Sequence, residues 1–100
     1  MIQARHFATT PGANIIEMGD KKIMWGKATI QSVPNDQDKT ITVTFPETFG
    51  SIPTVAATCA GWMAIRGVFA TDIGKGSMKL GAHHIQGTTL NVPIDWLAIG

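Results

Sequence analysis

Apolar and polar residues alternate over short stretches along most of the chain. The clearest stretch is Lys39–Phe45, KTITVTF, in which apolar residues alternate with three threonines. A period of two predicts a β-strand with one buried face, and threonine suits the exposed face of a pleated sheet. Along PTVAATC, the residues Val55, Ala57 and Cys59 alternate in the same way and are expected to face inward.

Further apolar runs of similar length are separated by Gly, Pro, Asn or Asp, and this spacing predicts an all-β sandwich or barrel. Met18-Gly19-Asp20 is expected to be a hairpin turn, and Gly67 a bulge or close-packing position. Pro93 predicts an edge position or a bulge, because proline has no N–H for the ladder. The expected strands are 14–17, 21–25, 27–33, 39–45, 53–59, 62–71, 77–85 and 88–99.

Residues 1–13 show no sustained period and end near Pro11-Gly12, a pair that punctuates structure. We therefore expect residues 1–13 to be an N-terminal connector and residues 14–100 to form one β-sandwich domain. A chain of 100 residues has room for one small domain and excludes large cofactor folds.

The composition limits the classes of molecule that this chain is expected to bind. A formal charge of +1 lacks the basic footprint expected for nucleic-acid binding or for an anionic membrane surface. With 15% charged and 44% hydrophobic residues, part of the surface is expected to face another chain. The single Cys59 excludes an internal disulfide framework.

No apolar run approaches the roughly 18 residues of a membrane span, so no membrane insertion is expected. The stretch Met1–Thr10 has no clear signal-peptide pattern, so secretion by that route is not supported. Both expectations are compatible with a protein that is made in a cytoplasm and exposed only later.

Two stretches carry a resemblance to a known group of proteins. KIMWG at Lys22–Gly26 and VTFPETFGSIPTVAATC at Val43–Cys59 resemble the C-terminal domain of bacteriophage tail-fibre and receptor-binding proteins. The ending VPIDWLAIG, Val92–Gly100, is similar to the closing strand of the same domains and of the H-type lectins.

The resemblance implies an antiparallel β-sandwich of six to seven strands that associates as a homotrimer, with glycan sites near the subunit boundaries. It implies a receptor-binding head at the virion tail or fibre tip, in contact with other tail proteins, that binds a bacterial surface glycan. The alternative is a structural decoration or trimerisation module of the virion that binds only proteins. Grouping of the candidate polar residues around one outward groove would favour the first hypothesis over the second. A free lectin is a third and weaker reading.

His83-His84 is the most prominent polar pair in the sequence. Neighbouring residues on a strand point to opposite faces, so the two rings are not expected to grip one metal within a chain. One histidine from each of three subunits could still form a metal site on a symmetry axis. Otherwise each ring is an ordinary satisfied histidine, or, with Gln86, a sugar contact suggested by the H-type lectin resemblance.

Asn35, Asp36 and Asp38 form an acidic loop between two expected strands. A solvated turn is the simplest interpretation, since Asn and Asp are common turn residues. In the H-type lectins a comparable loop supplies an aspartate that accepts hydrogen bonds from sugar hydroxyls, so Asp36 or Asp38 could have that role. Calcium would need more oxygen ligands than this loop offers, and nothing supports a glycosidase pair.

The three tryptophans are each expected to be core residues first. Trp62, beside Gly61 at the start of an expected strand, has the best claim to exposure, and an exposed indole is a natural platform for the apolar face of a sugar ring. Arg66 could donate to sugar oxygens or could be an ordinary strand residue. No nucleophile constellation and no phosphate loop is present in the sequence, so neither an enzyme nor a bound cofactor or metal is expected.

Overall fold

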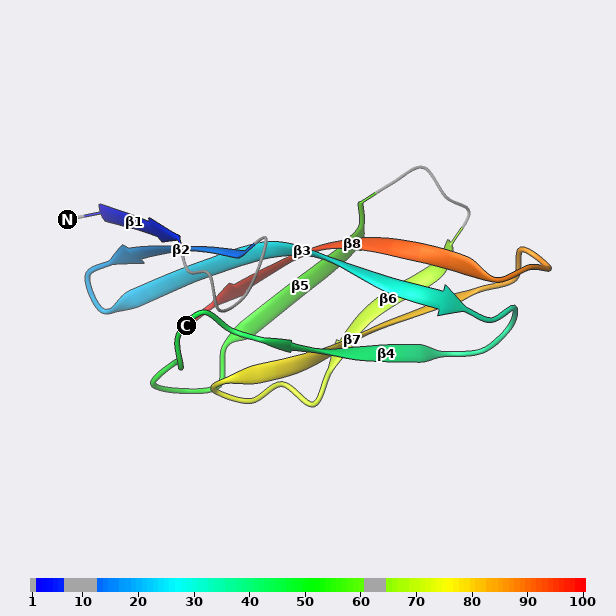
Figure 1. The fold of residues 1–100 in the computed structure, drawn as a ribbon. Helices are drawn as coiled ribbons and strands as arrows, with labels where there is room; N and C mark the ends of the chain where they lie inside the picture. Colours follow the sequence, from blue (N-terminus) through cyan, green and yellow to red (C-terminus); the bar gives the residue numbers. More distant parts are fainter. Residues whose placement is uncertain (1, 7–12, 61–64) are drawn as a thin grey trace.

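The fold consists of two antiparallel sheets that face each other (Figure 1). The computed structural model describes residues 2–6, 13–60 and 65–100, and among these the side chains of 14–60 and 67–100. No helix in this part of the chain is long and apolar enough to cross a membrane. The strands are β1 (Ile2–His6), β2 (Ala13–Met18), β3 (Lys21–Val33), β4 (Lys39–Thr44), β5 (Thr54–Cys59), β6 (Ile65–Thr71), β7 (Ser77–His84) and β8 (Leu90–Ile99).

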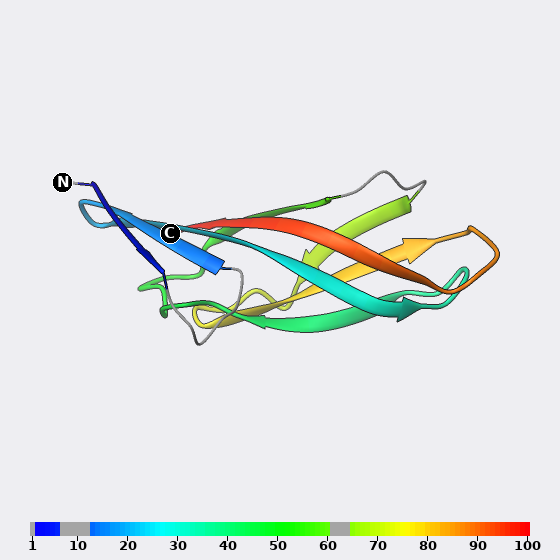
Figure 2. The same cartoon turned by 45° about the horizontal axis from the view of Figure 1, so that its top comes forward.

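The larger sheet has the strand order β1-β2-β3-β8-β5, and the smaller sheet has the order β4-β7-β6. All the pairings are antiparallel, so the predicted antiparallel β-sandwich is confirmed. The molecule is elongated, with extents of 48 × 21 × 20 Å. Figures 1 and 2 show the β3–β4 and β7–β8 connections together at one end, far from β1.

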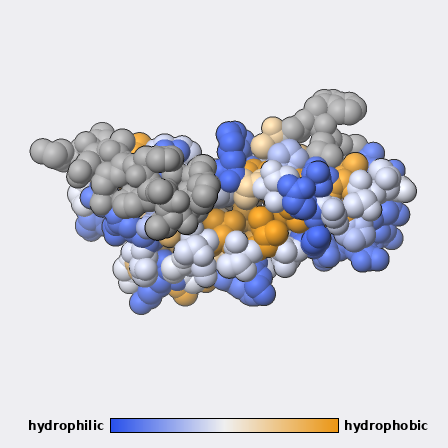
Figure 3. Space-filling view, viewed as in Figure 1, coloured by the Kyte–Doolittle hydropathy of each residue, from blue (hydrophilic) through white to orange (hydrophobic). Residues whose placement is uncertain are grey.

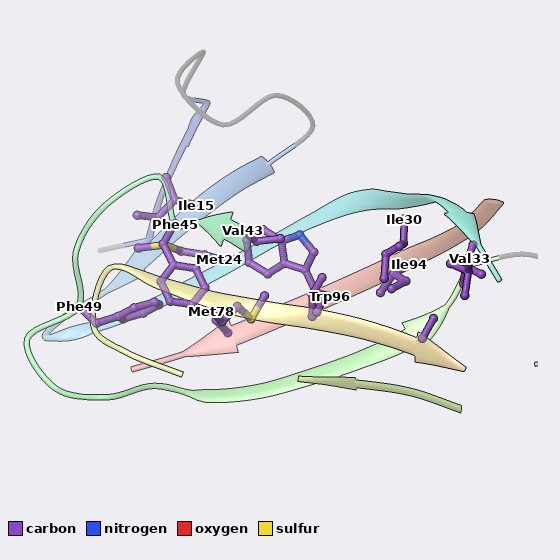
Figure 4. Packing of buried hydrophobic residues seen from close by; sticks show 14 residues of the cluster. Ile15, Met24, Ile30, Val33, Val43, Phe45, Phe49, Met78, Ile94 and Trp96 are labelled. Carbon is purple, nitrogen blue, oxygen red and sulfur yellow. The ribbon is translucent and has the colours of Figure 1, made fainter. Parts of the chain in front are cut away.

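The core lies between the two sheets and is supplied by alternate residues of the strands. In β8, Val92, Ile94, Trp96 and Ala98 are all buried, and the residues between them are not. Phe45 and Phe49 close the end of the core opposite the β3–β4 loop, and their rings meet edge to face at 5.2 Å (Figure 4). The core cluster consists of Ile15, Met24, Ile30, Val33, Val43, Phe45, Phe49, Met78, Leu80, Ala82, Val92, Ile94, Trp96 and Ala98.

The hairpin predicted at Met18-Gly19-Asp20 is confirmed. Gly19 and Asp20 form the two-residue loop between Met18 and Lys21, which pair with each other. Gly19 has a φ of 61°, which L side chains rarely adopt, and a glycine at the first loop position suits a type II′ turn. The bulge predicted at Gly67 is also confirmed by a register shift between Ile65 and Gly67.

Two strands predicted on either side of Gly26 are instead one strand of 13 residues, β3. Glycine does not interrupt this strand because the missing side chain makes room for the core. A Cβ built on Gly26 would lie 2.9 Å from the Trp96 ring. Gly26 therefore marks a close approach between neighbouring strands.

The N-terminal connector expected over residues 1–13 contains a strand at Ile2–His6. These residues form β1, which pairs in register with β2 at the edge of the larger sheet. Alternation is the main signal for a half-buried strand, and it is missing from these residues, so β1 could not be predicted from the pattern. Residues 7–12 lie outside the described part of the chain.

Pro93 was predicted at a strand edge or bulge, yet β8 lies between β3 and β5. The main-chain N–H of Ala60 donates to the Pro93 carbonyl at 2.9 Å, directly after the last residue of β5. Pro93 therefore withholds its N–H only where the ladder with β5 ends, and one hydrogen bond is lost. A β3 register shift lies close by, between Ile30 and Val33.

Trp25 is not a core residue, contrary to expectation. Its strand neighbours Met24 and Gly26 are buried on the inner face, so Trp25 points to the outer face of the larger sheet and is half-buried. Trp96 is 3% exposed, as predicted for a core residue. Strand alternation, and not side-chain size, decides which tryptophan enters the core.

Candidate functional site

Two loops that are far apart in sequence meet at one end of the molecule. We call this end the apex: residues 34–38, between β3 and β4, and residues 85–89, between β7 and β8. The Asp36 N–H donates to the His84 carbonyl at 2.7 Å, and the Gly87 N–H donates to Asn35 Oδ1 at 2.7 Å. These bonds fix the acidic loop against the end of β7.

His83 lies between the two carboxylates of the acidic loop. Its Nδ1 is 2.7 Å from Asp38 Oδ1, and its Nε2 is 3.0 Å from Asp36 Oδ1. Asp36 has a φ of 55°, a left-handed conformation that Asp tolerates and that turns its side chain back toward β7. The sequence predicted these three residues separately, and the structure brings them together.

Both ring nitrogens of His83 face carboxylate oxygens, and this favours the imidazolium form. Only the protonated ring has two N–H donors, so only that form makes both hydrogen bonds. The hydrogen bond to Asp38, followed by that to Asp36, raises the pKa of His83 above its usual value of 6.5. Desolvation opposes this increase but does not reverse it.

The two aspartates remain open to solvent while they bind His83. The Asp36 and Asp38 side chains are 71% and 67% exposed, against 29% for His83. Within the described residues neither Oδ2 has a hydrogen-bond partner. The apex therefore presents carboxylate oxygens, held in place by one imidazole, that can accept hydrogen bonds from a ligand.

His84 does not belong to this cluster, since the alternation along β7 turns it into the core. It is fully buried, and its Nε2 donates to the Val33 carbonyl at 2.7 Å. Its Nδ1 accepts from the Gln86 N–H at 3.2 Å. Both ring nitrogens are thus used inside the protein, which leaves His84 a structural role. The predicted opposition of the two histidines across the sheet is confirmed.

The remaining predicted site residues have different positions. Gln86 is exposed in the apex loop after β7. Trp62 lies outside the described residues, and Arg66 lies in β6 with a side chain that is outside the description. No group of three or more His, Cys, Asp or Glu residues suited to a metal ion is found in the part of the chain that the structure describes.

Phe69 is a candidate that the sequence analysis missed. Val68 and Ala70 pack against the core, so Phe69 points to the outer face of the smaller sheet, where it is half-buried. The tip of its ring lies over Gly81, where a Cβ would be 2.2 Å from Cζ. Gly81 inside the predicted strand 77–85 was the available signal, because a glycine there often marks a close approach.

Apart from Phe69, the described side chains on the outer face of the smaller sheet are polar or are glycines. Register places Gly67 opposite His83, and Phe69 opposite Gly81. On the other side of β7, Thr40 pairs with Gly81 and is exposed. Phe69 is therefore an aromatic ring among hydroxyl and charged groups. Its partner Gly81 precedes His83 by two residues on the same face of β7, so Phe69 is close to the His83 cluster, by which we mean Asp36, Asp38 and His83. Figure 3 shows hydrophilic atoms at the apex and apolar atoms gathered midway along the molecule.

Comparisons with known proteins indicate the fold. No protein-family model matches the chain, and no curated protein matches it. Among solved structures, an N-truncated R1-type pyocin tail fibre superposes with a TM-score of 0.77 at 19% identity, over 100% of this chain and 85% of that one. A longer R1 pyocin fibre of P. aeruginosa gives the same score, and this chain spans 28% of it.

The tailspike protein gp49 of Pseudomonas phage LKA1 is also similar, with a TM-score of 0.63 and 20% identity. It matches 77% of this chain and 14% of the tailspike. The chain thus has the fold of a tail-fibre C-terminal domain. The predicted resemblance to tail fibres is confirmed at the level of the fold, and the similarity to H-type lectins stays a prediction.

Proposed function

We propose that this chain is the receptor-binding head of a phage tail fibre and that it binds a saccharide on the bacterial surface. The observation that supports the proposal is the His83 cluster, in which one imidazole presents two exposed carboxylates at the apex. Carboxylates accept hydrogen bonds from pairs of hydroxyl groups, which sugars carry in abundance. The likeness in fold to pyocin tail fibres and a phage tailspike supports the viral context.

The grouping of three candidate residues favours the proposal over a purely structural virion module. Asp36, Asp38 and His83 come together at the apex, far from β1 (Figure 1), whereas His84 is buried and Trp62 lies outside the described residues. In the proposed setting, other tail proteins hold the fibre, and the apex points toward the host. The chain would be made in the host cytoplasm and assembled into the virion tail.

We also propose that the head is a homotrimer. The outer face of the larger sheet is apolar around Trp25, Leu97 and Ile99, and Leu97 and Ile99 are 38% and 42% exposed. A shallow groove of about 200 Å³ follows β5 and β8 on this face. Further copies of this chain would cover these side chains, and three apices on one axis would multiply the modest affinity of a single sugar site.

The proposal is tested by replacing the two carboxylates with amides. Asp36→Asn and Asp38→Asn, singly and together, should weaken binding to an array of bacterial surface polysaccharides at least tenfold in the double variant. Asp72→Asn is the matched control, because Asp72 is also exposed but is paired with Lys79 outside the apex. A correctly folded trimer that binds no polysaccharide on the array would contradict the proposal.

A further inference from the structure

Phe69 is the largest apolar side chain on the outer face of the smaller sheet, and the core does not explain it. It is absent from the core cluster and from the partly buried residues packed against that cluster. The ring contacts among the described residues, Phe45 with Phe49 and Phe45 with Trp96, do not include it. The tip of its ring lies over Gly81, whose missing side chain lets the ring lie low on the sheet.

The outer surface of Gly67, two residues before Phe69, is not covered by the other strands that the structure describes. Gly67 precedes Phe69 by two residues on the same strand and pairs with His83. Apart from the two chain neighbours of Gly67, no described atom lies within 4 Å of a Cβ built on Gly67, so no described side chain of another strand covers this glycine. Residues two apart on a strand share a face and lie about 7 Å apart. The distance suits a single sugar ring.

We propose that Phe69, Gly67 and Thr40 form a stacking subsite for a neutral pyranose, next to the carboxylates Asp36 and Asp38. This subsite rests on the proposed function and names its ligand class. The apolar C–H face of the pyranose would lie against the Phe69 ring, as sugars commonly lie on aromatic platforms. Its hydroxyls would donate to the two carboxylates and exchange hydrogen bonds with the Thr40 hydroxyl.

The described polar groups at this site favour a ligand that donates hydrogen bonds. Asp36 and Asp38 offer acceptors. Lys39 is bound to the Gln31 carbonyl at 2.7 Å, and Lys79, two residues before Gly81 on the same face, is paired with Asp72 at 3.4 Å. An acidic sugar brings a second anion toward these carboxylates and is disfavoured by like-charge repulsion. The neutral sugar should therefore bind more tightly than the uronic acid with the same ring.

The test uses the full chain and a panel of methyl glycosides in which each neutral hexopyranoside is paired with its uronic acid. Binding is measured by two-dimensional amide NMR titration. We expect shifts at Gly67, Phe69 and Gly81 together with His83, and at least threefold weaker binding of each uronic acid. Phe69→Leu should weaken the neutral sugar about tenfold, while Phe69→Tyr, which keeps the ring, should retain most of the affinity.

A second variant separates stacking from a purely structural cover over Gly81. Gly81→Ala keeps the aromatic ring but displaces it, since the added Cβ would occupy the position of Cζ. Loss of affinity in both Phe69→Leu and Gly81→Ala, with the fold retained by circular dichroism, supports the subsite. A neutral sugar that binds wild type and Phe69→Leu equally, with shifts confined to residues 36–38 and 83, overturns the subsite but leaves the proposed function. No binding of any glycoside at millimolar concentration, or tighter binding of the uronic acids, also overturns it. The polysaccharide array then decides the proposed function separately.

Discussion

The two sheets share one core, but their outer faces differ in chemistry. The larger sheet exposes apolar side chains at Trp25, Leu97 and Ile99. The smaller sheet exposes the threonines of β4 and, at its end, the His83 cluster. Strand alternation decides which residues leave the core, and the chemistry of those residues indicates what they meet. In the proposed function, the larger sheet serves assembly and the smaller sheet serves recognition.

The largest effect that sharpens this comparison should come from the inner layer. Trp96→Ala removes the ring that packs on Gly26 and meets Phe45 at 5.9 Å, and should lower the free energy of unfolding by about 3–5 kcal/mol. Trp25→Ala, on the outer face of the same sheet, should cost a monomer about 1 kcal/mol. Chemical denaturation measures both. Equal losses in the two variants would mean that the assignment of faces is wrong.

An intermediate effect is expected on assembly. Leu97→Lys places a charge in the centre of the apolar outer face and should convert a particle of three times 10.7 kDa into a monomer, as measured by light scattering. Thr42→Lys is the matched control, because Thr42 is exposed midway along β4, on the outer face of the opposite sheet. A trimer that survives Leu97→Lys and dissociates in Thr42→Lys would reverse the roles of the two faces.

The smallest effect concerns the protonation of His83. Its pKa is raised in the folded protein, so the stabilisation is complete below the usual pKa of 6.5 and is lost as the pH increases through the folded value. Asp38→Asn should lower the pKa of His83 more than Asp36→Asn, because the shorter hydrogen bond to Asp38 is the largest cause of the shift. NMR titration of the ring protons measures it. An unchanged pKa in Asp38→Asn would show that the two groups are not bonded in solution.

Much of the fold could be predicted from the sequence, because alternation and turn residues are local signals. Lys39–Thr44 and the Gly19 turn were found from these signals alone. Gly26 and Pro93 led to wrong predictions. In a sequence, a glycine that makes room for Trp96 looks the same as a glycine that ends a strand. A proline at the end of one hydrogen-bond ladder looks the same as a proline on an edge strand. In both cases the decisive neighbour is distant in sequence.

The candidate site was predicted in part. Asp36, Asp38 and His83 were named from residue type and from the resemblance, but their mutual distances depend on how two loops meet. His84 was named with them, although strand alternation already placed it on the opposite face from His83. Phe69 was missed because a single aromatic in an apolar strand looks like core until the register with Gly81 is known.

Two hydrogen bonds between the apex loops limit how the sequences of these loops can vary. Asn35 Oδ1 accepts from the Gly87 N–H, and the Asp36 N–H donates to the His84 carbonyl. An insertion in either loop alone would move one partner beyond hydrogen-bond distance. Substitutions at the exposed residues Gln37 and Thr88 leave both hydrogen bonds intact. As the host receptor changes, related chains are therefore expected to carry substitutions at these two positions and to keep the loop lengths constant.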